Sequence, residues 1–212
     1  GFVVASINYR LSGHAIFPAQ ITDCKAAIRW LRANAGKYGI DGDHIGVWGS
    51  SAGGHLVALL GTSGDVVDLE GDGGNVDQSS RVQAVCDWFG PTDLLLMNQQ
   101  AGDRGTIDHD AADSPESKLL GGSLQDNADK AKRAGPITYV TPDDPPFMIV
   151  HGDQDSLVHW KQSQMLADSL TKSKCDVTLT IVAGAGHGRF RDPKITEDSF
   201  RFFEKTLLSK VP

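Results

Sequence analysis

The chain has 212 residues, of which 40% are hydrophobic, and carries a formal net charge of −7 at pH 7. This length and composition can bury one hydrophobic core, so we expect a single globular domain over residues 1–212. The acidic balance, without a basic stripe, argues against nucleic acid as a partner. No apolar run approaches the roughly 20 residues that cross a membrane.

Strand-like and helix-like segments alternate along the chain. This alternation predicts an α/β fold, with a mostly parallel sheet covered by helices on both faces. The predicted strands, in chain order, are 1–10, 44–48, 81–89, 145–150 and 176–182. The predicted helices are 17–35, 54–60, 160–170 and 193–208. Residues 94–135 interrupt the alternation because they are polar and Gly-rich, and we interpret them as an insertion made of short helices.

The segment Gly49-Ser50-Ser51-Ala52-Gly53 lies between a predicted strand and a predicted helix. A buried strand, a turn of small residues and a helix form the context that a G-x-S-x-G nucleophile elbow requires. The small residues permit a sharp turn that exposes the middle serine, and the helix N-terminus faces the charge that develops there. Ser51 is therefore the predicted nucleophile of acyl transfer through a covalent serine ester.

An activated serine needs a base, and the base needs an orienting acid. In this fold class the chain order is Ser, then Asp or Glu, then His. Asp155 follows the predicted strand 145–150, and His187 follows the predicted strand 176–182. Because ligand sites in open parallel sheets lie at the carboxyl ends of strands, we expect these side chains to meet. We assign His187 as general base and acid and Asp155 as the residue that holds its tautomer.

Other polar residues near these segments have competing interpretations. Asp153 competes with Asp155 for the role of the acid, or caps the following turn. His55 and His151 are interpreted as hydrogen-bonded structural histidines rather than second bases. The acidic stretch 65–74 is interpreted as a solvated loop rather than a calcium site, because its oxygen spacing is wrong and it lacks a closing Glu. No cofactor and no metal are expected.

The chain resembles the α/β-hydrolase-fold carboxylesterases, and is most similar to bacterial hormone-sensitive-lipase-like, feruloyl and acetyl-xylan esterases. The stretches that carry the resemblance are 7–12, 23–31, 49–55, 88–93, 151–155 and 186–188. The resemblance implies the α/β-hydrolase fold over the whole chain. In this fold class an insertion at the position of residues 94–135 forms a lid, so we expect a small cap that shapes the substrate pocket.

Two features depart from the family pattern. Position 50 is Ser where such esterases most often carry Asp or Glu, and no His-Gly-Gly-Gly segment of the oxyanion hole precedes the elbow. The backbone N–H of Ala52 is the assigned oxyanion donor. We expect the N-terminal strands of the fold to be missing and the chain to be the C-terminal part of a longer enzyme. The strand 1–10 would then pair directly with 44–48, or two chains would exchange strands in a homodimer.

These observations favour a serine carboxylic ester hydrolase that acts on small-molecule esters with short acyl chains. Acetyl or feruloyl esters of plant polysaccharides are implied by the resemblance alone. Trp88 and Val158 are the candidate substrate-contacting residues, although Trp88 fits a core position equally well. A short polar cap and an acidic surface predict no large lipid-facing apolar patch.

Two alternatives stay open at this point. One is a serine peptidase of the prolyl-oligopeptidase type, although no Tyr follows the elbow glycines. The other is a catalytically impaired hydrolase fragment that acts only as a binding protein. Cys24, Cys86 and Cys175 are interpreted as free thiols rather than a disulfide with one spare cysteine. The sequence leaves the localisation open.

Overall fold

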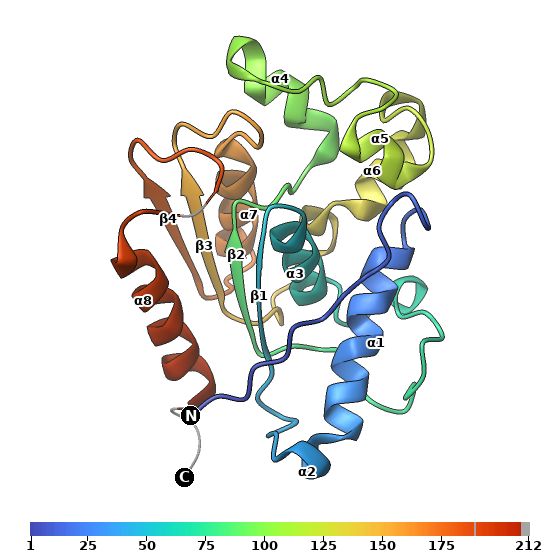
Figure 1. Cartoon of the computed structure of the whole chain (residues 1–212), viewed down its shortest axis with the longest axis vertical. Coiled ribbons are helices and arrows are strands. Elements are labelled where there is room, and N and C mark those ends of the chain that lie inside the picture. The colour runs from blue at the N-terminus through green and yellow to red at the C-terminus, as the bar shows by residue number, and fades with distance from the viewer. Residues whose placement is uncertain (189, 209–212) are drawn as a thin grey trace.

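A parallel sheet forms the centre of the computed structural model, which describes residues 1–188 and 190–208 (Figure 1). The strands are β1 (Gly46–Ser50), β2 (Ala84–Trp88), β3 (Phe147–Gly152) and β4 (Val177–Val182). They lie side by side in this order, and each strand is parallel to the next. All carboxyl ends therefore share one edge of the sheet. This arrangement confirms the predicted α/β class.

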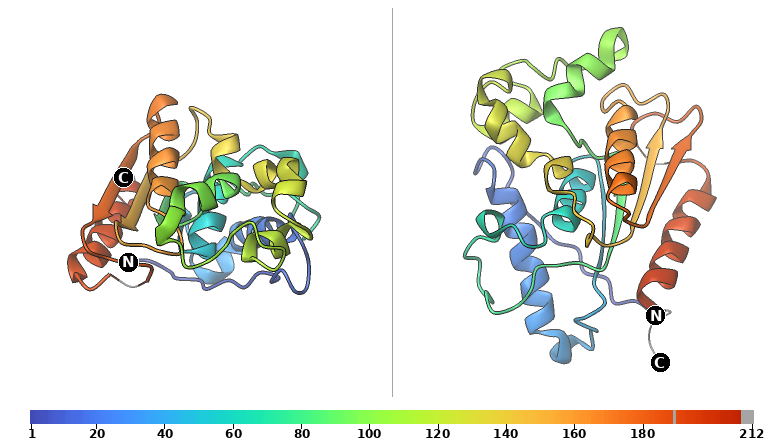
Figure 2. Two further views of the ribbon diagram at one scale, coloured as in Figure 1. Left: turned by 90° about the horizontal axis from the view of Figure 1, so that it is seen from above. Right: turned by 180° about the vertical axis from the view of Figure 1, so that it is seen from behind.

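Helices cover both faces of the sheet (Figure 2). The main helices are α1 (Ala19–Ala33), α3 (Ala52–Thr62), α7 (Lys161–Lys172) and α8 (Pro193–Phe203), which continues into a π-helical turn, η6 (Glu204–Leu208). Because side chains alternate along a strand, Val85 and Ile149 pack with α1, α3 and α7 on one face. Their neighbours Cys86 and Val150 pack with α8 and η6 on the other. The two central strands, β2 and β3, are thus buried on both faces, whereas β1 and β4 are partly exposed.

The insertion consists of short helices, as predicted. It contains α4 (Met97–Ala101), α5 (Pro115–Leu120) and α6 (Ala128–Ala134), with 3-10 turns at η2 (Leu94–Leu96), η3 (Gly102–Arg104) and η4 (Gln125–Asn127). Figure 1 shows these helices together beyond the carboxyl ends of the strands, on the side of α1 and α3. The remaining short elements are α2 (Ala35–Tyr38), η1 (Val67–Leu69) and η5 (Pro136–Tyr139).

The strand predicted for residues 1–10 is wrong. This segment has no ladder hydrogen bonds, and it pairs neither with β1 nor with another described strand. A strand exists only where a neighbouring strand accepts its hydrogen bonds, and here Arg10 instead binds Asp23 of α1 through both its backbone N–H and its guanidinium. The segment runs outside the sheet from the lower end of α8 to the start of α1 (Figure 1).

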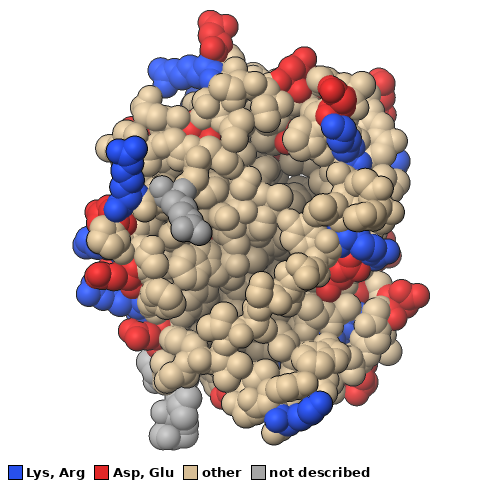
Figure 3. All heavy atoms as spheres, viewed as in Figure 1, with Lys and Arg blue, Asp and Glu red and all other residues tan. Residues whose placement is uncertain are grey.

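The N-terminal segment also carries exposed apolar side chains. Residues 2–16 carry several exposed apolar side chains, among them Val4 at 87% and Leu11 at 60% of full exposure. On the face shown in Figure 3, charged side chains of both signs lie around the rim and leave the centre uncharged. Without a partner strand, the alternating side chains of this segment have no second layer to pack against, so they stay in contact with solvent.

The acidic stretch 65–74 is held by buried cations instead of being merely solvated. Lys25 Nζ, fully buried, lies 2.6 Å from Glu70 Oε1 and donates to the Ser63 carbonyl. The Arg29 guanidinium lies 2.8 Å from Glu70 Oε2 and also donates to the Gly74 carbonyl. Burial lowers the pKa of Lys25, and the Glu70 carboxylate opposes that shift. Glu70 is thus the counter-ion of two cations on α1.

Substitution of Glu70 tests this arrangement. Glu70→Gln removes the counter-charge and leaves two buried cations, which should lower the free energy of unfolding by about 2–3 kcal/mol, less than for a fully buried pair because Glu70 is partly exposed. Asp68→Asn, an exposed carboxylate of the same loop, is the matched control and should change stability by less than about 0.5 kcal/mol. Urea denaturation measures both. Equal stability of the two variants would contradict the counter-ion role.

Candidate active site

Ser51 occupies a strained turn between β1 and α3. Its φ and ψ angles are 54° and −121°, which lie outside the regions that a serine ordinarily occupies. The turn is fixed by two hydrogen bonds of 2.9 Å, from Ser51 N–H to the Trp88 carbonyl and from His55 N–H to the Ser51 carbonyl. A Cβ at Gly49 would overlap the Gly53 carbonyl group. The predicted elbow is therefore present, and its close backbone contact requires glycine at position 49.

Below the elbow lies Asp87, a residue that the sequence analysis missed. It is fully buried, its Oδ1 accepts a hydrogen bond from Gly90 N–H, and its Oδ2 has no partner among the described residues. Burial raises the pKa of Asp87 to about 6. A Cβ at Gly54 would overlap Asp87 Oδ1 and lie 2.8 Å from the Trp88 carbonyl oxygen. The second glycine that the turn needs is therefore Gly54, not Gly53 of the sequence motif.

Three polar side chains meet at the carboxyl edge of the sheet. His187 Nε2 lies 2.9 Å from Ser51 Oγ, and His187 Nδ1 lies 2.7 Å from Asp155 Oδ2. Asp155 follows β3 and His187 follows β4, so neighbouring parallel strands deliver them to the same edge. The His187 side chain is 15% exposed and the Asp155 side chain is fully buried. The structure thus brings together the three residues that the sequence analysis singled out.

The carboxylate of Asp155 is surrounded by donors. The N–H groups of Leu157 and Val158 each donate to Oδ1 at 2.9 Å, and His151 Nε2 lies 3.2 Å from Oδ2. Burial by itself raises the pKa of Asp155, but the bonds from His151, His187 and the backbone outweigh it and hold that pKa well below its usual range. Asp155 is therefore an ionised acceptor for the His187 N–H at neutral pH.

The competing residues have other partners. Asp153 Oδ1 accepts from Gly184 N–H at 2.7 Å and so holds the loop before His187. His55 Nδ1 lies 3.1 Å from the Pro91 carbonyl, and His151 Nδ1 lies 2.7 Å from Ser163 Oγ. Both histidines are hydrogen-bonded in the interior, as predicted. The contact of His151 with Asp155 was not predicted. The sequence pattern shows that the two residues are close along the chain, but it does not show which way their side chains point.

A cleft of about 530 Å³ opens at Ser51. Its lining residues come from the ends of β1 and β2 and from the loop after β4: Trp48, Gly49, Ser50, Ser51, Trp88, Phe89, His187 and Gly188. The Phe89 ring packs edge-on against the His187 ring at 4.7 Å, and Trp48 packs against Trp88 at 5.0 Å between centroids. Trp88 lines this cleft and is also buried in the core on the side of α8, so it takes both of the positions that the sequence analysis considered.

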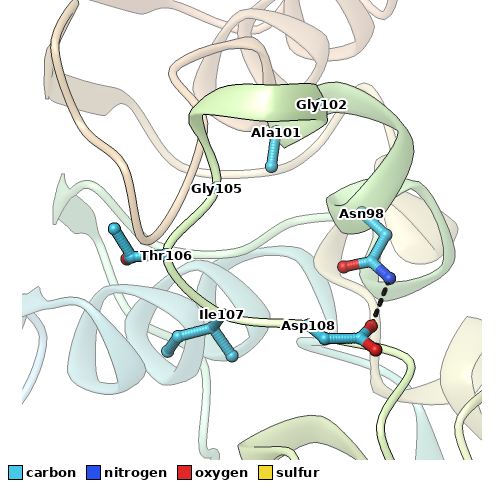
Figure 4. Close-up of a pocket in the computed structure, with 7 residues that line it drawn as sticks. All are labelled: Asn98, Ala101, Gly102, Gly105, Thr106, Ile107 and Asp108. Carbon is cyan, nitrogen blue, oxygen red and sulfur yellow. Dashed lines mark hydrogen bonds between the residues drawn. The ribbon is translucent and has the colours of Figure 1, made fainter.

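Two expectations about the surroundings of the cleft are wrong. The side chain of Val158 lies in the main core at 5% exposure, and only its backbone N–H faces the site, where it donates to Asp155 Oδ1. The insertion contributes no residue to the lining of this cleft. It surrounds a separate open pocket of about 370 Å³, formed by Asn98, Ala101, Gly102 and residues 105–108 (Figure 4).

Ala52 is the first residue of α3, so its N–H is among the donors that have no partner within the helix.

Within the described residues, no cluster of three or more His, Cys, Asp or Glu side chains could hold a metal ion. Among the described helices, none combines the length and hydropathy that a membrane span requires. The three cysteines are free, as predicted, with Cys24 and Cys86 buried.

The sequence model of the BD-FAE family matches residues 1–170. The chain belongs to the BD-FAE family. Among curated relatives, it is 33% identical over 190 residues to Esterase LipC and 34% identical over 171 residues to Esterase LipQ, both of Mycobacterium tuberculosis. These matches cover 89% and 80% of this chain but 45% and 38% of the relatives. The BD-FAE chain thus spans less than half the length of these curated relatives.

Solved structures give the same fold. A bifunctional GH43-CE protein of Bacteroides eggerthii is 40% identical with a TM-score of 0.87, covering 95% of this chain and 27% of that protein. A truncated form of a carbohydrate esterase from gut microbiota is 39% identical with a TM-score of 0.88, covering 96% of this chain and 73% of that one. The BD-FAE chain therefore has the α/β-hydrolase fold of esterases.

The glycine at position 54 of this BD-FAE chain gives a stability test. Gly54→Ala should destabilise the fold by about 1–3 kcal/mol, because the new methyl group meets buried backbone and the Asp87 carboxylate. Gly53→Ala is the matched control: a Cβ there has no heavy atom within 4 Å, and alanine favours a helix, so stability should stay or rise by up to about 1 kcal/mol. Urea denaturation compares them. A more harmful change at Gly53 would contradict the packing described.

The two aspartates after β3 give a second test. Asp155→Asn should lower kcat by about 10⁴-fold without changing the fold, because an amide stabilises the wrong tautomer of His187. Asp153→Asn should have a mild effect, since the amide oxygen can still accept from Gly184 N–H. Ester hydrolysis assays and circular dichroism check both variants. The reverse order of effects would mean that the acid is Asp153.

Proposed function

We propose that this chain carries the catalytic site of a serine carboxylic ester hydrolase, with Ser51, His187 and Asp155 as its triad. The observation that carries the proposal is the continuous chain of contacts from Ser51 Oγ to His187 Nε2 at 2.9 Å and from His187 Nδ1 to Asp155 Oδ2 at 2.7 Å. This geometry suits a nucleophile, a base and an orienting carboxylate. The names of the similar proteins, esterases and carbohydrate esterases, support the same reaction class.

In the first half of the reaction, Ser51 Oγ attacks the ester carbonyl carbon and His187 Nε2 takes the hydroxyl proton. The carbonyl oxygen becomes an oxyanion, which the N–H of Ala52 and the N-terminus of α3 stabilise. The intermediate collapses to an acyl-serine, and His187 gives its proton to the leaving alcohol. Asp155 stays ionised throughout, and it holds Nδ1–H and stabilises the imidazolium.

In the second half, a water molecule replaces the alcohol. His187 removes one proton from the water, the resulting oxygen attacks the acyl carbon, and the bond to Ser51 Oγ breaks. The proton returns from His187 to Ser51, which releases the carboxylic acid and restores the site. The strained elbow keeps Ser51 Oγ exposed at the cleft in both halves.

We propose short-chain acyl esters as the substrates, with acetyl or feruloyl esters of plant polysaccharides as the class to examine first. The cleft at Ser51 has aromatic side chains, Trp48, Trp88 and Phe89, in its wall. Rings of this kind pack against a flat or small acyl group. The similar structures described as a carbohydrate esterase and a bifunctional GH43-CE protein support a carbohydrate ester.

Substitution of Ser51 tests the reaction class. With p-nitrophenyl acetate as substrate, Ser51→Ala should lower kcat on the order of 10⁶-fold, and His187→Ala should cost about as much, because the two act as one unit. The melting temperature should stay nearly unchanged. Ser173→Ala, at the C-cap of α7, is the control and should keep full activity. More than a few per cent of activity in Ser51→Ala would rule out the covalent mechanism.

Acyl chain length gives a separate test of the substrate class. The values of kcat/KM for p-nitrophenyl acetate and butyrate should exceed the value for the palmitate ester, because the aromatic wall limits the acyl group that the cleft of about 530 Å³ can hold. No activation should occur at an oil–water interface. Faster turnover of the palmitate ester would favour a lipase, and cleavage of prolyl peptides in place of esters would favour a peptidase.

A further inference from the structure

The two peptide units between Ser156 and Val158 are hydrogen-bonded on both sides. On their N–H side, Leu157 and Val158 each donate to Asp155 Oδ1 at 2.9 Å. The carbonyl of a trans peptide points away from its N–H. On that side, the Ser156 carbonyl accepts from Thr106 N–H at 3.0 Å and from Thr106 Oγ1 at 3.1 Å. The Leu157 carbonyl lies 3.0 Å from His109 Nε2. We call residues 155–158 the acid loop.

His109 is suited to hold the acid loop. It is only 2% exposed, and because the Leu157 carbonyl can only accept, Nε2 must carry a proton. The other ring nitrogen, Nδ1, lies 3.0 Å from Glu116 Oε2 of α5, itself 8% exposed. Nε2 thus makes a hydrogen bond, whereas Nδ1 lies within ion-pair distance of the carboxylate without hydrogen-bond geometry. Burial opposes a charge on His109, but the Glu116 carboxylate and the Leu157 carbonyl outweigh it and raise the pKa of this imidazole.

The segment that presents these donors is fixed by its own hydrogen bonds. Asn98 Oδ1 accepts from His109 N–H at 2.7 Å, and Asn98 Nδ2 donates to Asp108 Oδ1 at 2.6 Å and to Asp110 Oδ2 at 3.0 Å. Figure 4 shows the Asn98 side chain pointing to Asp108 across the pocket, with Thr106 on the opposite wall. The segment that carries Thr106 and His109 is therefore fixed by hydrogen bonds to Asn98 of α4.

We propose that His109 and Thr106 are positioning residues for Asp155, and that the insertion is a brace behind the acid loop. The proposal rests on the proposed function. Each of the two peptide units between Ser156 and Val158 is bound on both sides. Its carbonyl accepts from a donor of the insertion, and its N–H donates to the Asp155 carboxylate, which orients His187. An amide whose carbonyl accepts a hydrogen bond is a more polarised donor, so the brace also strengthens the two bonds to Asp155.

His109→Leu removes the donor to Leu157 while keeping an apolar side chain. It should lower kcat for p-nitrophenyl acetate by about 10- to 100-fold, because a small displacement of the acid misaligns His187. KM should change by less than about threefold, since His109 is not in the lining of the cleft. The acid limb of the pH profile of kcat/KM should move to lower pH. His109→Gln keeps an N–H donor and should recover part of kcat.

A spectroscopic readout separates this role from the proposed function. The low-field ¹H resonance of the His187 Nδ1–H, identified by its loss in Asp155→Asn, should shift or broaden in His109→Leu. Leu120→Ala, which creates a cavity in the same helix as Glu116 at a side chain that can make no hydrogen bond to the acid loop, is the control for loss of stability alone. Assayed where it is folded, it should keep the wild-type kcat, pH profile and resonance.

Thr106→Val serves where His109→Leu does not fold, because Thr106 is exposed and its backbone N–H bond remains. It should lower kcat by about threefold, in line with one lost neutral hydrogen bond, and should shift the same resonance.

An unchanged resonance and pH profile in folded His109→Leu, or in Thr106→Val if it alone folds, would overturn the brace. Losses that follow melting temperature equally in His109→Leu and Leu120→Ala would also overturn it. A wild-type protein without Ser51-dependent hydrolysis would contradict the proposed function, while the resonance would still test the brace.

Discussion

The hydrogen bonding of one buried carboxylate, that of Asp155, organises the site. A carboxylate without water around it is stable only if donors replace the water, and here the donors are two backbone N–H groups and two imidazoles. Those donors come from the acid loop, from β3 and from the loop after β4. Satisfying the charge of Asp155 therefore also fixes the path of the chain after two strands. Through His187, the same contacts reach Ser51 in the turn that follows a third strand.

The elbow imposes a second constraint, which is steric. Ser51 is held in an unfavourable backbone conformation because the close contacts around Gly49 and Gly54 leave no other path between β1 and α3. Asp87 lies directly below this contact, buried and with one oxygen unpaired among the described residues. The strained serine and the buried carboxyl both lower the stability of the fold. Packing in the two-sided core, in which every residue of β2 is buried, offsets this loss. A rigid sheet is thus what allows an unfavourable turn at its edge.

Local pattern was sufficient for much of this architecture. Four strands, the main helices, the elbow and the three polar residues at Ser51, Asp155 and His187 followed from apolar runs, glycine positions and chain order. The wrong predictions concern strand pairing and side-chain packing, which depend on a second segment of the chain. Residues 1–10 have the composition of a strand but pair with none of the described strands. The side chain of Val158 lies in the core, while its N–H donates to Asp155. The hydrogen bonds from the insertion to residues 156 and 157, and the contacts of Glu70 with Lys25 and Arg29, join segments that no spacing rule connects.

The contact between Ser51 and His187 spans 136 residues of sequence. Protein synthesis adds about 5–20 residues per second, so on the order of 10 s separates the appearance of the serine from that of its histidine on the ribosome. During that interval β1, α3 and β2 can form, while the serine hydroxyl has no base beside it. Trp88 likewise waits for Ser199 of α8, to which its indole N–H donates at 3.3 Å. In the proposed mechanism, a nascent chain of this protein therefore lacks its base until all four strands of the sheet have been synthesised.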